Sequence, residues 1–232
     1  GHINSGSFDP FDEIIPLAHK HGAWVHVDGA FGLWANAVEP LRHLSQGVEL
    51  ADSWSVDGHK WLQVPYDAGF GIVRDAEAHK RVMSITASYL TASADDGRSP
   101  SAYVPELSRR ARGFAVWATL QALGRQGVRD MVLGHCQCAK HLAARLNEVP
   151  GIHVLNDVVL NQVALAFGHK GPDDKATKNI IDHLQAENLH FVLGASWHSH
   201  VILRISIISM LTKIVDIDSL ADAIIRAWRG QS

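Results

Sequence analysis

The sequence predicts an α/β protein built in two parts. Over roughly the first eighty residues, helical and strand patterns alternate, which is typical of a parallel sheet covered by helices. From residue 151 onward, short strand patterns predominate and favour a small α+β unit with an antiparallel sheet. We therefore expect part of a large domain at residues 1–125 and a small domain at residues 126–232, with a linking helix at residues 126–150.

The first part is expected to contain helices and three strands. Asp9 followed by Pro10 is a typical helix start, and Gly22 is a suitable C-terminal cap. Apolar and β-branched runs predict the strands, and the small, polar residues 87–104 predict a loop. The strands are expected at residues 24–28, 53–56 and 69–73, a charged helix at residues 75–82, and a short helical piece near residues 41–44.

A long helical pattern leads from the first part into the second. Phe114, Trp117 and Leu120 recur with the helical period, which predicts a helix over residues 112–125 that Gly127 breaks. A second helix should follow over residues 128–149. Strands are then expected at residues 152–155, 158–167, 189–193 and 200–208, and helices at residues 173–187 and 216–228, with Thr212 or Asp216 as the cap of the last one.

Composition excludes several classes of partner. The chain has 232 residues, is 47% hydrophobic and carries a formal net charge of −3, so it shows no basic footprint for nucleic acid or an anionic membrane. No apolar run is long enough to span a bilayer, and no signal segment is evident. Cys136 and Cys138 are too close for a useful structural disulfide, which favours a reducing, cytoplasmic setting.

Two residues at predicted strand ends point to cofactor chemistry. Asp28 and Lys60 each end a candidate strand, and parallel neighbouring strands would bring them into one crevice. Pyridoxal phosphate needs this pair, because a lysine forms its Schiff base and an acid pairs with its pyridinium nitrogen. From the residues alone, Lys60 could instead be a solvated surface lysine after a strand, and Asp28 could be a loop-start residue that caps the next helix.

Three stretches carry a family resemblance. They read FDPFDEIIPLAHKHGAWVHVDGAFG, then DSWSVDGHKWLQVPYDAG, then PELSRRARGFAVWATLQALGR. Together they resemble the group II pyridoxal-phosphate-dependent decarboxylases, the amino-acid decarboxylases of the aspartate-aminotransferase fold (fold type I). The resemblance weakens after about Ile208. It implies a homodimer, and it implies that this chain is the C-terminal portion of a longer protein.

The resemblance assigns five residues to the cofactor. Lys60 would form the Schiff base and act as a catalytic residue, while Asp28 would pair with the ring nitrogen. Ala30 would lie against one face of the ring. His59 and Asp57 match family positions near the phosphate, although His59 could instead pack at a strand end and Asp57 could be a turn residue.

Other matched positions concern the substrate. Arg204, in VILRISIIS, matches a strand arginine that binds the substrate carboxylate, although a solvent-facing arginine remains the alternative. Tyr103 would correspond to the loop tyrosine that helps to protonate the carbanion, acting across the dimer. Arg109 and Arg110 also match the family, with no role assigned to either.

The cluster of His135, Cys138 and His141 has the spacing of one helix face. A single helix rarely supplies a tetrahedral set of ligands, so we predict no metal site and interpret these residues as a packed face.

The resulting prediction is decarboxylation of an L-amino acid that depends on pyridoxal phosphate and proceeds through a Lys60 Schiff base. A transaminase or carbon–sulfur lyase of the same fold is an alternative, because it would share Asp28 and Lys60. A non-catalytic fragment is a second alternative. The sequence does not name the amino acid.

Overall fold

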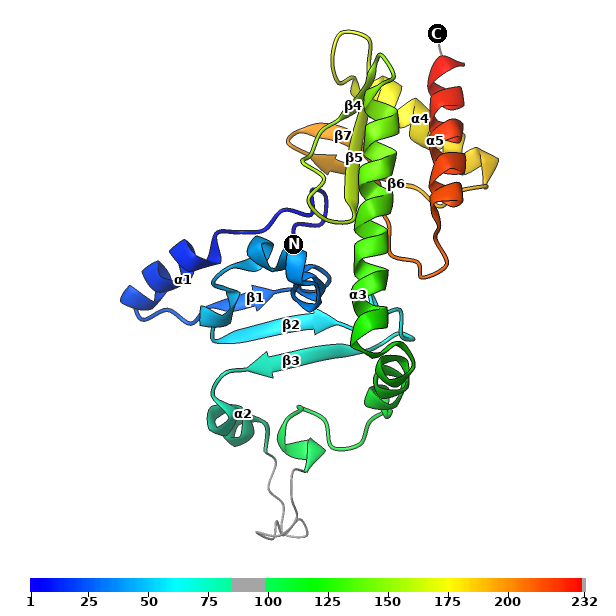
Figure 1. The fold of residues 1–232 in the computed structure, drawn as a ribbon. Coiled ribbons are helices and arrows are strands. Elements are labelled where there is room, and N and C mark those ends of the chain that lie inside the picture. The colour runs from blue at the N-terminus through cyan, green and yellow to red at the C-terminus, as the bar shows by residue number, and fades with distance from the viewer. Residues whose placement is uncertain (85–98, 231–232) are drawn as a thin grey trace.

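Two separate sheets, joined by one long helix, make up the protein (Figure 1). The computed structural model describes residues 1–84 and 99–230. Most of the loop expected at residues 87–104 therefore lies outside the described residues; its end forms the short 3-10 helix η4 (Pro100–Ala102). Within the described part, no helix combines the length and the apolar character that crossing a bilayer requires.

The first sheet has the order β1-β2-β3, with β1 at His26–Asp28, β2 at Ser53–Asp57 and β3 at Gly69–Val73. β1 and β2 are parallel, as expected, but β2 and β3 are antiparallel. The expectation of a wholly parallel sheet is therefore wrong for β3. Residues 58–68 connect the two strands without a helix, and a parallel return needs a longer crossover.

One α-helix and three 3-10 helices accompany β1 and β2. Phe11 and Ile15 of α1 pack against Val27 of β1 and Val48 in one apolar cluster. The expected cap by Asp9 is not formed, because α1 begins two residues later and has no side-chain cap. The helices are α1 (Phe11–Lys20), η1 (Gly32–Ala37), η2 (Glu39–Ser45) and η3 (Val48–Leu50), and α2 (Ala76–Met83) follows β3.

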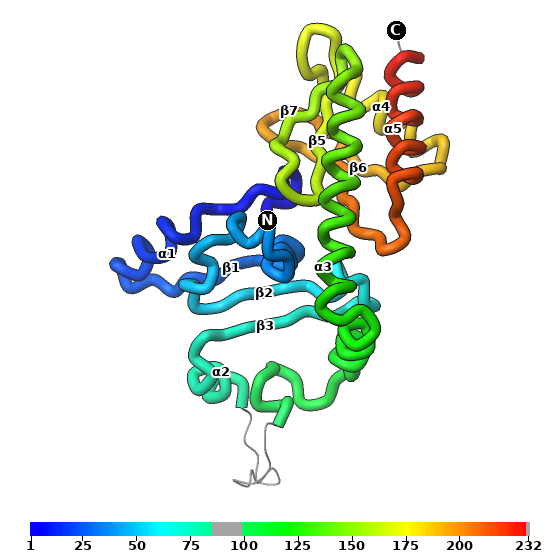
Figure 2. Tube along the Cα trace, in the orientation of Figure 1, coloured from blue at the N-terminus to red at the C-terminus, as the bar shows by residue number. Residues whose placement is uncertain are grey.

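The long helix α3 (Arg112–Asn147) runs from the first sheet to the second, as both views show (Figure 2). It is interrupted at Gly124, where φ is 60° and ψ is −175°. The break expected at Gly127 is therefore displaced to Gly124, which adopts a backbone conformation essentially restricted to glycine. Both parts of the protein share α3, so the helix itself does not mark a boundary. We propose to divide the chain into residues 1–125, which contain the first sheet, and residues 126–232, which contain the second sheet.

The second sheet has the order β4-β5-β7-β6 and is antiparallel throughout, as expected. The prediction of a strand at residues 189–193 is wrong, because β6 begins only at Leu193. The strand β5 is shorter than the predicted range of residues 158–167. Asp216 accepts a hydrogen bond from the Lys213 amide and so caps α5. The elements are β4 (Ile152–Val154), β5 (Gln162–Phe167), α4 (Asp174–Glu187), β6 (Leu193–Trp197), β7 (His200–Ser206) and α5 (Ile214–Arg229).

A buried histidine ties the two parts together. The indole Nε1 of Trp61 donates to His135 Nδ1 at 2.8 Å, and His135 Nε2 donates to the carbonyl of Ser209 at 2.9 Å. These partners require the neutral ring with its hydrogen on Nε2, and burial lowers the pKa of His135 below its ordinary value of 6.5. His135 thus joins the segment after β2, helix α3 and the segment after β7.

Replacing His135 by leucine should reduce stability in a pH-dependent way. At pH 7.5 the H135L variant should lose about 2 kcal/mol of unfolding free energy, because the Trp61 N–H and the Ser209 carbonyl lose their partner. The contribution of the neutral ring is complete above pH 6.5 and declines as the pH falls through the lowered pKa, since the unfolded chain then binds the proton more readily. Urea unfolding at pH 7.5 and 5 should therefore show a smaller difference at pH 5.

The exposed His43 provides the control for this measurement. The H43L variant should follow the wild-type protein at both pH values. An H135L variant whose deficit is the same at pH 7.5 and 5 would contradict the assignment of the neutral ring.

Two of the four glycines of α3 should respond oppositely to alanine. Gly124→Ala should cost about 1–3 kcal/mol, because its backbone lies in a region that side chains rarely adopt. Gly134→Ala should stabilise by up to about 1 kcal/mol, because Gly134 has helical geometry and an added Cβ would meet nothing within 4 Å. Thermal unfolding of both variants measures the contrast, and a stabilising G124A would refute the position of the break.

Candidate active site

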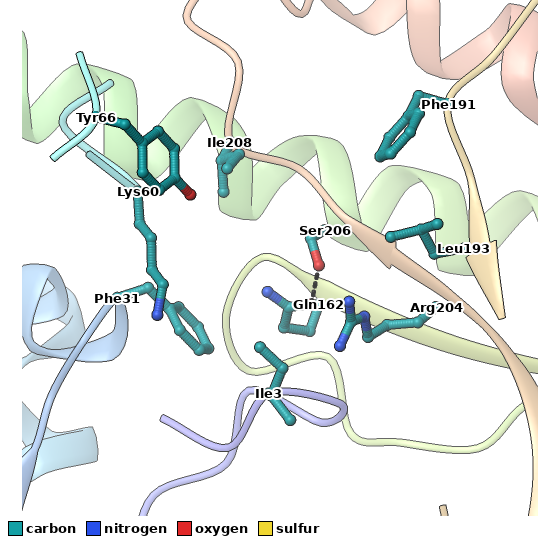
Figure 3. Close-up of a pocket in the computed structure, with 10 residues that line it drawn as sticks. All are labelled: Ile3, Phe31, Lys60, Tyr66, Gln162, Phe191, Leu193, Arg204, Ser206 and Ile208. Atoms are coloured by element: carbon teal, nitrogen blue, oxygen red, sulfur yellow. Dashed lines mark hydrogen bonds between the residues drawn. The ribbon is translucent and has the colours of Figure 1, made fainter. Parts of the chain in front are cut away.

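A pocket of about 390 Å³ lies between the turn after β2 and the second sheet (Figure 3). Lys60 lines it from the side of the first sheet and Arg204 from the side of the second. Its other polar residues are Tyr66, Gln162 and Ser206, and its apolar residues are Ile3, Phe31, Phe191, Leu193 and Ile208. The structure therefore brings the predicted Lys60 and Arg204 to one cavity whose walls are mostly apolar.

Lys60 is positioned by the turn that ends β2. Its Nζ lies 3.0 Å from Asp57 Oδ2, and its side chain is 36% exposed. Trp61 and Leu62 are fully buried, but they belong to two other apolar clusters. The Lys60 ammonium is therefore paired with the Asp57 carboxylate at the edge of the cavity. Trp61 and Leu62 anchor the turn in two different apolar clusters.

His59 is fixed by the same turn. Its Nδ1 lies 2.7 Å from the carbonyl oxygen of Ala68 and 3.2 Å from the amide nitrogen of the same residue, and the shorter contact favours a hydrogen on Nδ1. Nε2 faces Asp57 Oδ2 at 3.5 Å, and the ring packs against Tyr66 with centroids 4.2 Å apart. Nε2 could donate to an anion only if the ring carried a second proton.

Asp28 ends β1 and is exposed. Its Oδ1 accepts hydrogen bonds from the Ala30 amide at 3.0 Å and from Ser55 Oγ at 3.4 Å. It does not cap the next helix, η1, which has no side-chain cap. The carbonyl of Ala30 in turn accepts from the Asp57 amide at 2.8 Å. The ends of β1 and β2 are thus held together, which brings these predicted cofactor residues to one edge of the sheet.

The face of the first sheet that carries Asp28 can accommodate a planar group. The register places Asp28 opposite Ser55, which is opposite Gly71, so these residues share one face. A Cβ added at Gly71 would meet nothing within 4 Å. A carboxylate, the amine of Lys60 and this open face match the ring nitrogen, the aldehyde and the ring of pyridoxal phosphate.

Arg204 is held in β7 opposite Ala164 of β5 and Leu193 of β6. Its Nε is buried, and within the described residues it has no hydrogen-bond partner. A buried guanidinium nitrogen without a partner is costly, so this geometry favours an anionic ligand in the pocket.

Tyr103 lies apart from this pocket. It follows η4, and its ring meets His79 of α2 edge-on with centroids 5.7 Å apart. It does not line the cavity that Lys60 and Arg204 share.

Two arginines at the start of α3, Arg110 and Arg112, stabilise the turn that carries Tyr66. Arg110 and Arg112 both bind Asp67 Oδ1, at 2.6 and 2.9 Å, and Arg110 also binds the carbonyl of Tyr66. The hydrogen bond from Arg112 is the main reason why the pKa of Asp67 is lowered to about 2. Arg109 instead binds the carbonyls of residues 106 and 107.

Both histidines of the helix face that carries Cys138 have protein partners. His135 binds Trp61 and Ser209, and His141 Nε2 lies 2.7 Å from Asp218 Oδ1. Burial raises the pKa of the Cys138 thiol.

Sequence reasoning missed Phe31, Tyr66, Gln162 and Ser206 as pocket residues. Gln162 did carry a signal, because it is a polar residue that opens the apolar run of β5.

Comparison with known proteins connects this site to a family. A family model described as "Pyridoxal-dependent decarboxylase conserved domain" matches residues 1–167. An aromatic-L-amino-acid decarboxylase of Drosophila lebanonensis is 27% identical over 94% of this chain and 54% of its own length. Tyrosine/DOPA decarboxylase 1 of Papaver somniferum is 33% identical over 61% of this chain and 28% of its own.

The solved structures show the same fold. Oryza sativa TDC, crystallised with PLP and tryptamine, superposes with a TM-score of 0.91 and 22% identity over 98% of this chain and 49% of its own. The chain thus spans about half the length of the relatives it matches. The fold is that of the fold type I decarboxylases, and the chain belongs to the pyridoxal-dependent decarboxylase family.

Proposed function

We propose that this chain supplies the Lys60 side of an active site that decarboxylates an aromatic L-amino acid with pyridoxal phosphate. The observation that carries the proposal is the shared cavity with mostly apolar walls, which is lined by Lys60 and by Arg204, whose buried Nε has no hydrogen-bond partner among the described residues. An amino acid has an amine, a carboxylate and a side chain. The cofactor held by Lys60 would take the amine, Arg204 would take the carboxylate, and the apolar walls would take the side chain.

Each cofactor residue has a distinct task in this proposal. Bound pyridoxal phosphate would supply an electron sink for the electron pair that remains when carbon dioxide leaves. Lys60 would attach the cofactor, and Asp28 would keep its ring nitrogen protonated by charge pairing. Asp57 would hold the Lys60 ammonium until the cofactor binds, and the His59 ring would meet the phosphate. Ala30 would leave room for the ring.

The second sheet would orient the substrate. Arg204 would bind the carboxylate, since a guanidinium matches its two oxygens. Phe31, Phe191 and Leu193 would receive an aromatic side chain, in keeping with the names of the decarboxylases from Drosophila lebanonensis and Papaver somniferum. Within one chain Tyr103 packs on His79, so a proton from Tyr103 would have to come from the other subunit of a homodimer.

Cofactor attachment should depend on Lys60. Incubation with pyridoxal phosphate followed by borohydride reduction should add one cofactor to the peptide that contains Lys60, because only a lysine amine that has condensed with the aldehyde becomes fixed. Peptide mass spectrometry should find this mass in the wild-type protein and in the K20R control, which changes an exposed lysine of α1, but not in K60R. Labelling confined to other lysines would remove Lys60 from the proposal.

Substrate turnover should depend on Arg204. Carbon dioxide release from L-tryptophan, L-tyrosine and L-phenylalanine should be measured for the wild-type protein, R204Q and the control R226Q, whose arginine is exposed on α5. R204Q should lower kcat/KM by roughly 10- to 100-fold, the range expected for a lost hydrogen bond to a charged group. Formation of a keto acid without carbon dioxide would instead favour the transaminase.

A further inference from the structure

We propose that Gln162 is a second substrate-binding residue, which donates a hydrogen bond to the same carboxylate as Arg204. The inference rests on the proposed function, because it assigns a further contact to the pocket of Lys60 and Arg204. It concerns the neutral side-chain amide of Gln162 beside Arg204. The family resemblance assigned no role to Gln162.

The strand register places the two side chains together. Gln162 is opposite Ser206 and Ala164 is opposite Arg204 in the β5–β7 pair. Residues opposite one another, and residues two apart on one strand, share a sheet face, so Gln162 and Arg204 are diagonal neighbours on the pocket side. Ala164, which lies on the same face, has only a small side chain, and Figure 3 shows the Gln162 and Arg204 side chains at the same wall of the pocket.

A hydrogen bond fixes the orientation of the Gln162 amide. Ser206 Oγ donates to Gln162 Oε1 at 2.6 Å, so the oxygen is engaged and the NH₂ group is the free end. The contact of Nε2 with Asn161 Oδ1 is long, at 3.5 Å, and the NH₂ group has two hydrogens. Gln162 is only 2% exposed, and among the described residues that 3.5 Å contact is the one hydrogen bond of its NH₂ group, so at least one of the two hydrogens has no protein partner there.

The N-terminal segment packs against the strand that carries Gln162. Gly6, with φ of 73°, turns the N-terminal segment onto β5, and a Cβ added to it would lie 3.6 Å from the Gln162 Cβ. The side-chain amide of Asn156 donates to the carbonyls of Ser5 and Gln162 at 3.0 Å each. Gln162 is therefore held by its backbone as well as by Ser206.

Two hydrogen-bond donors that lack good partners at the same wall, Arg204 Nε and the Gln162 NH₂ group, favour a carboxylate as the ligand group. Arg204 contributes charge and a buried Nε that has no partner in the described part of the chain, and Gln162 contributes a neutral N–H. Burying both is costly unless an acceptor with several lone pairs lies between them, and a carboxylate is such an acceptor. The amine that remains after decarboxylation has no such group, so the pair would favour binding of substrate over product.

The test compares an amino acid with its amine. Titration calorimetry with L-phenylalanine and with 2-phenylethylamine, on the 232-residue chain without added cofactor so that no turnover occurs, isolates the contribution of the carboxylate. Q162L should weaken L-phenylalanine binding about tenfold and leave 2-phenylethylamine binding unchanged, since one hydrogen bond to a charged group is lost. S206A should give a smaller change of the same kind, because the amide is then free to turn.

A charge variant makes the test sharper. Q162E should place a carboxylate beside Arg204, pair with it and reverse the preference, so that the amine binds more tightly than the amino acid. Q126L, which changes an exposed glutamine of α3, should behave as the wild-type protein.

Two outcomes would overturn the role of Gln162. One leaves the proposed function in place, and the other removes the proposed function as well. If Q162L weakens both ligands equally, or neither, then Gln162 has a structural role only, and the proposed function stands. If the wild-type protein binds neither ligand and Lys60 takes no cofactor label, then the proposed function falls together with the role of Gln162.

Discussion

The arrangement of the pocket depends on one buried chain of hydrogen bonds, from Trp61 through His135 to Ser209. Trp61 directly follows Lys60, and Ser209 lies just beyond the strand that carries Arg204. The His135 ring can satisfy both partners only in one tautomer and one position. Since unpaired polar groups are costly in a low-dielectric interior, this chain of bonds fixes the lysine relative to the arginine.

Charge pairing within the chain distinguishes the cations around the pocket. Lys60 faces Asp57, and Arg110 and Arg112 are bound to Asp67. Within the described residues, no carboxylate forms an ion pair with Arg204, and its Nε has no partner. Arg204 lies at the wall where the Gln162 NH₂ group has only a long contact, 3.5 Å from Asn161 Oδ1, so two weakly satisfied donors meet at the part of the pocket that we assign to the substrate.

Local patterns predicted the elements well where short-range physics decides them. The strands that end at Asp28 and near Asp57 follow from β-branched and apolar runs, and the cap of α5 follows from Asp216. Local patterns failed where neighbours decide. Both Gly124 and Gly127 could have ended the helix, and the direction of β3 depended on the length of the connection.

The sequence by itself determined the family fold, the lysine turn and the polar residues at the ends of β1 and β2, because turn residues and strand patterns act over a few neighbouring positions. Only the tertiary structure decided that Lys60 and Arg204 share a cavity, that Gln162 joins Arg204 and that Tyr103 packs elsewhere in the chain. Cross-strand register and the packing of α3 set these relations, and both arise from contacts between residues far apart in the sequence.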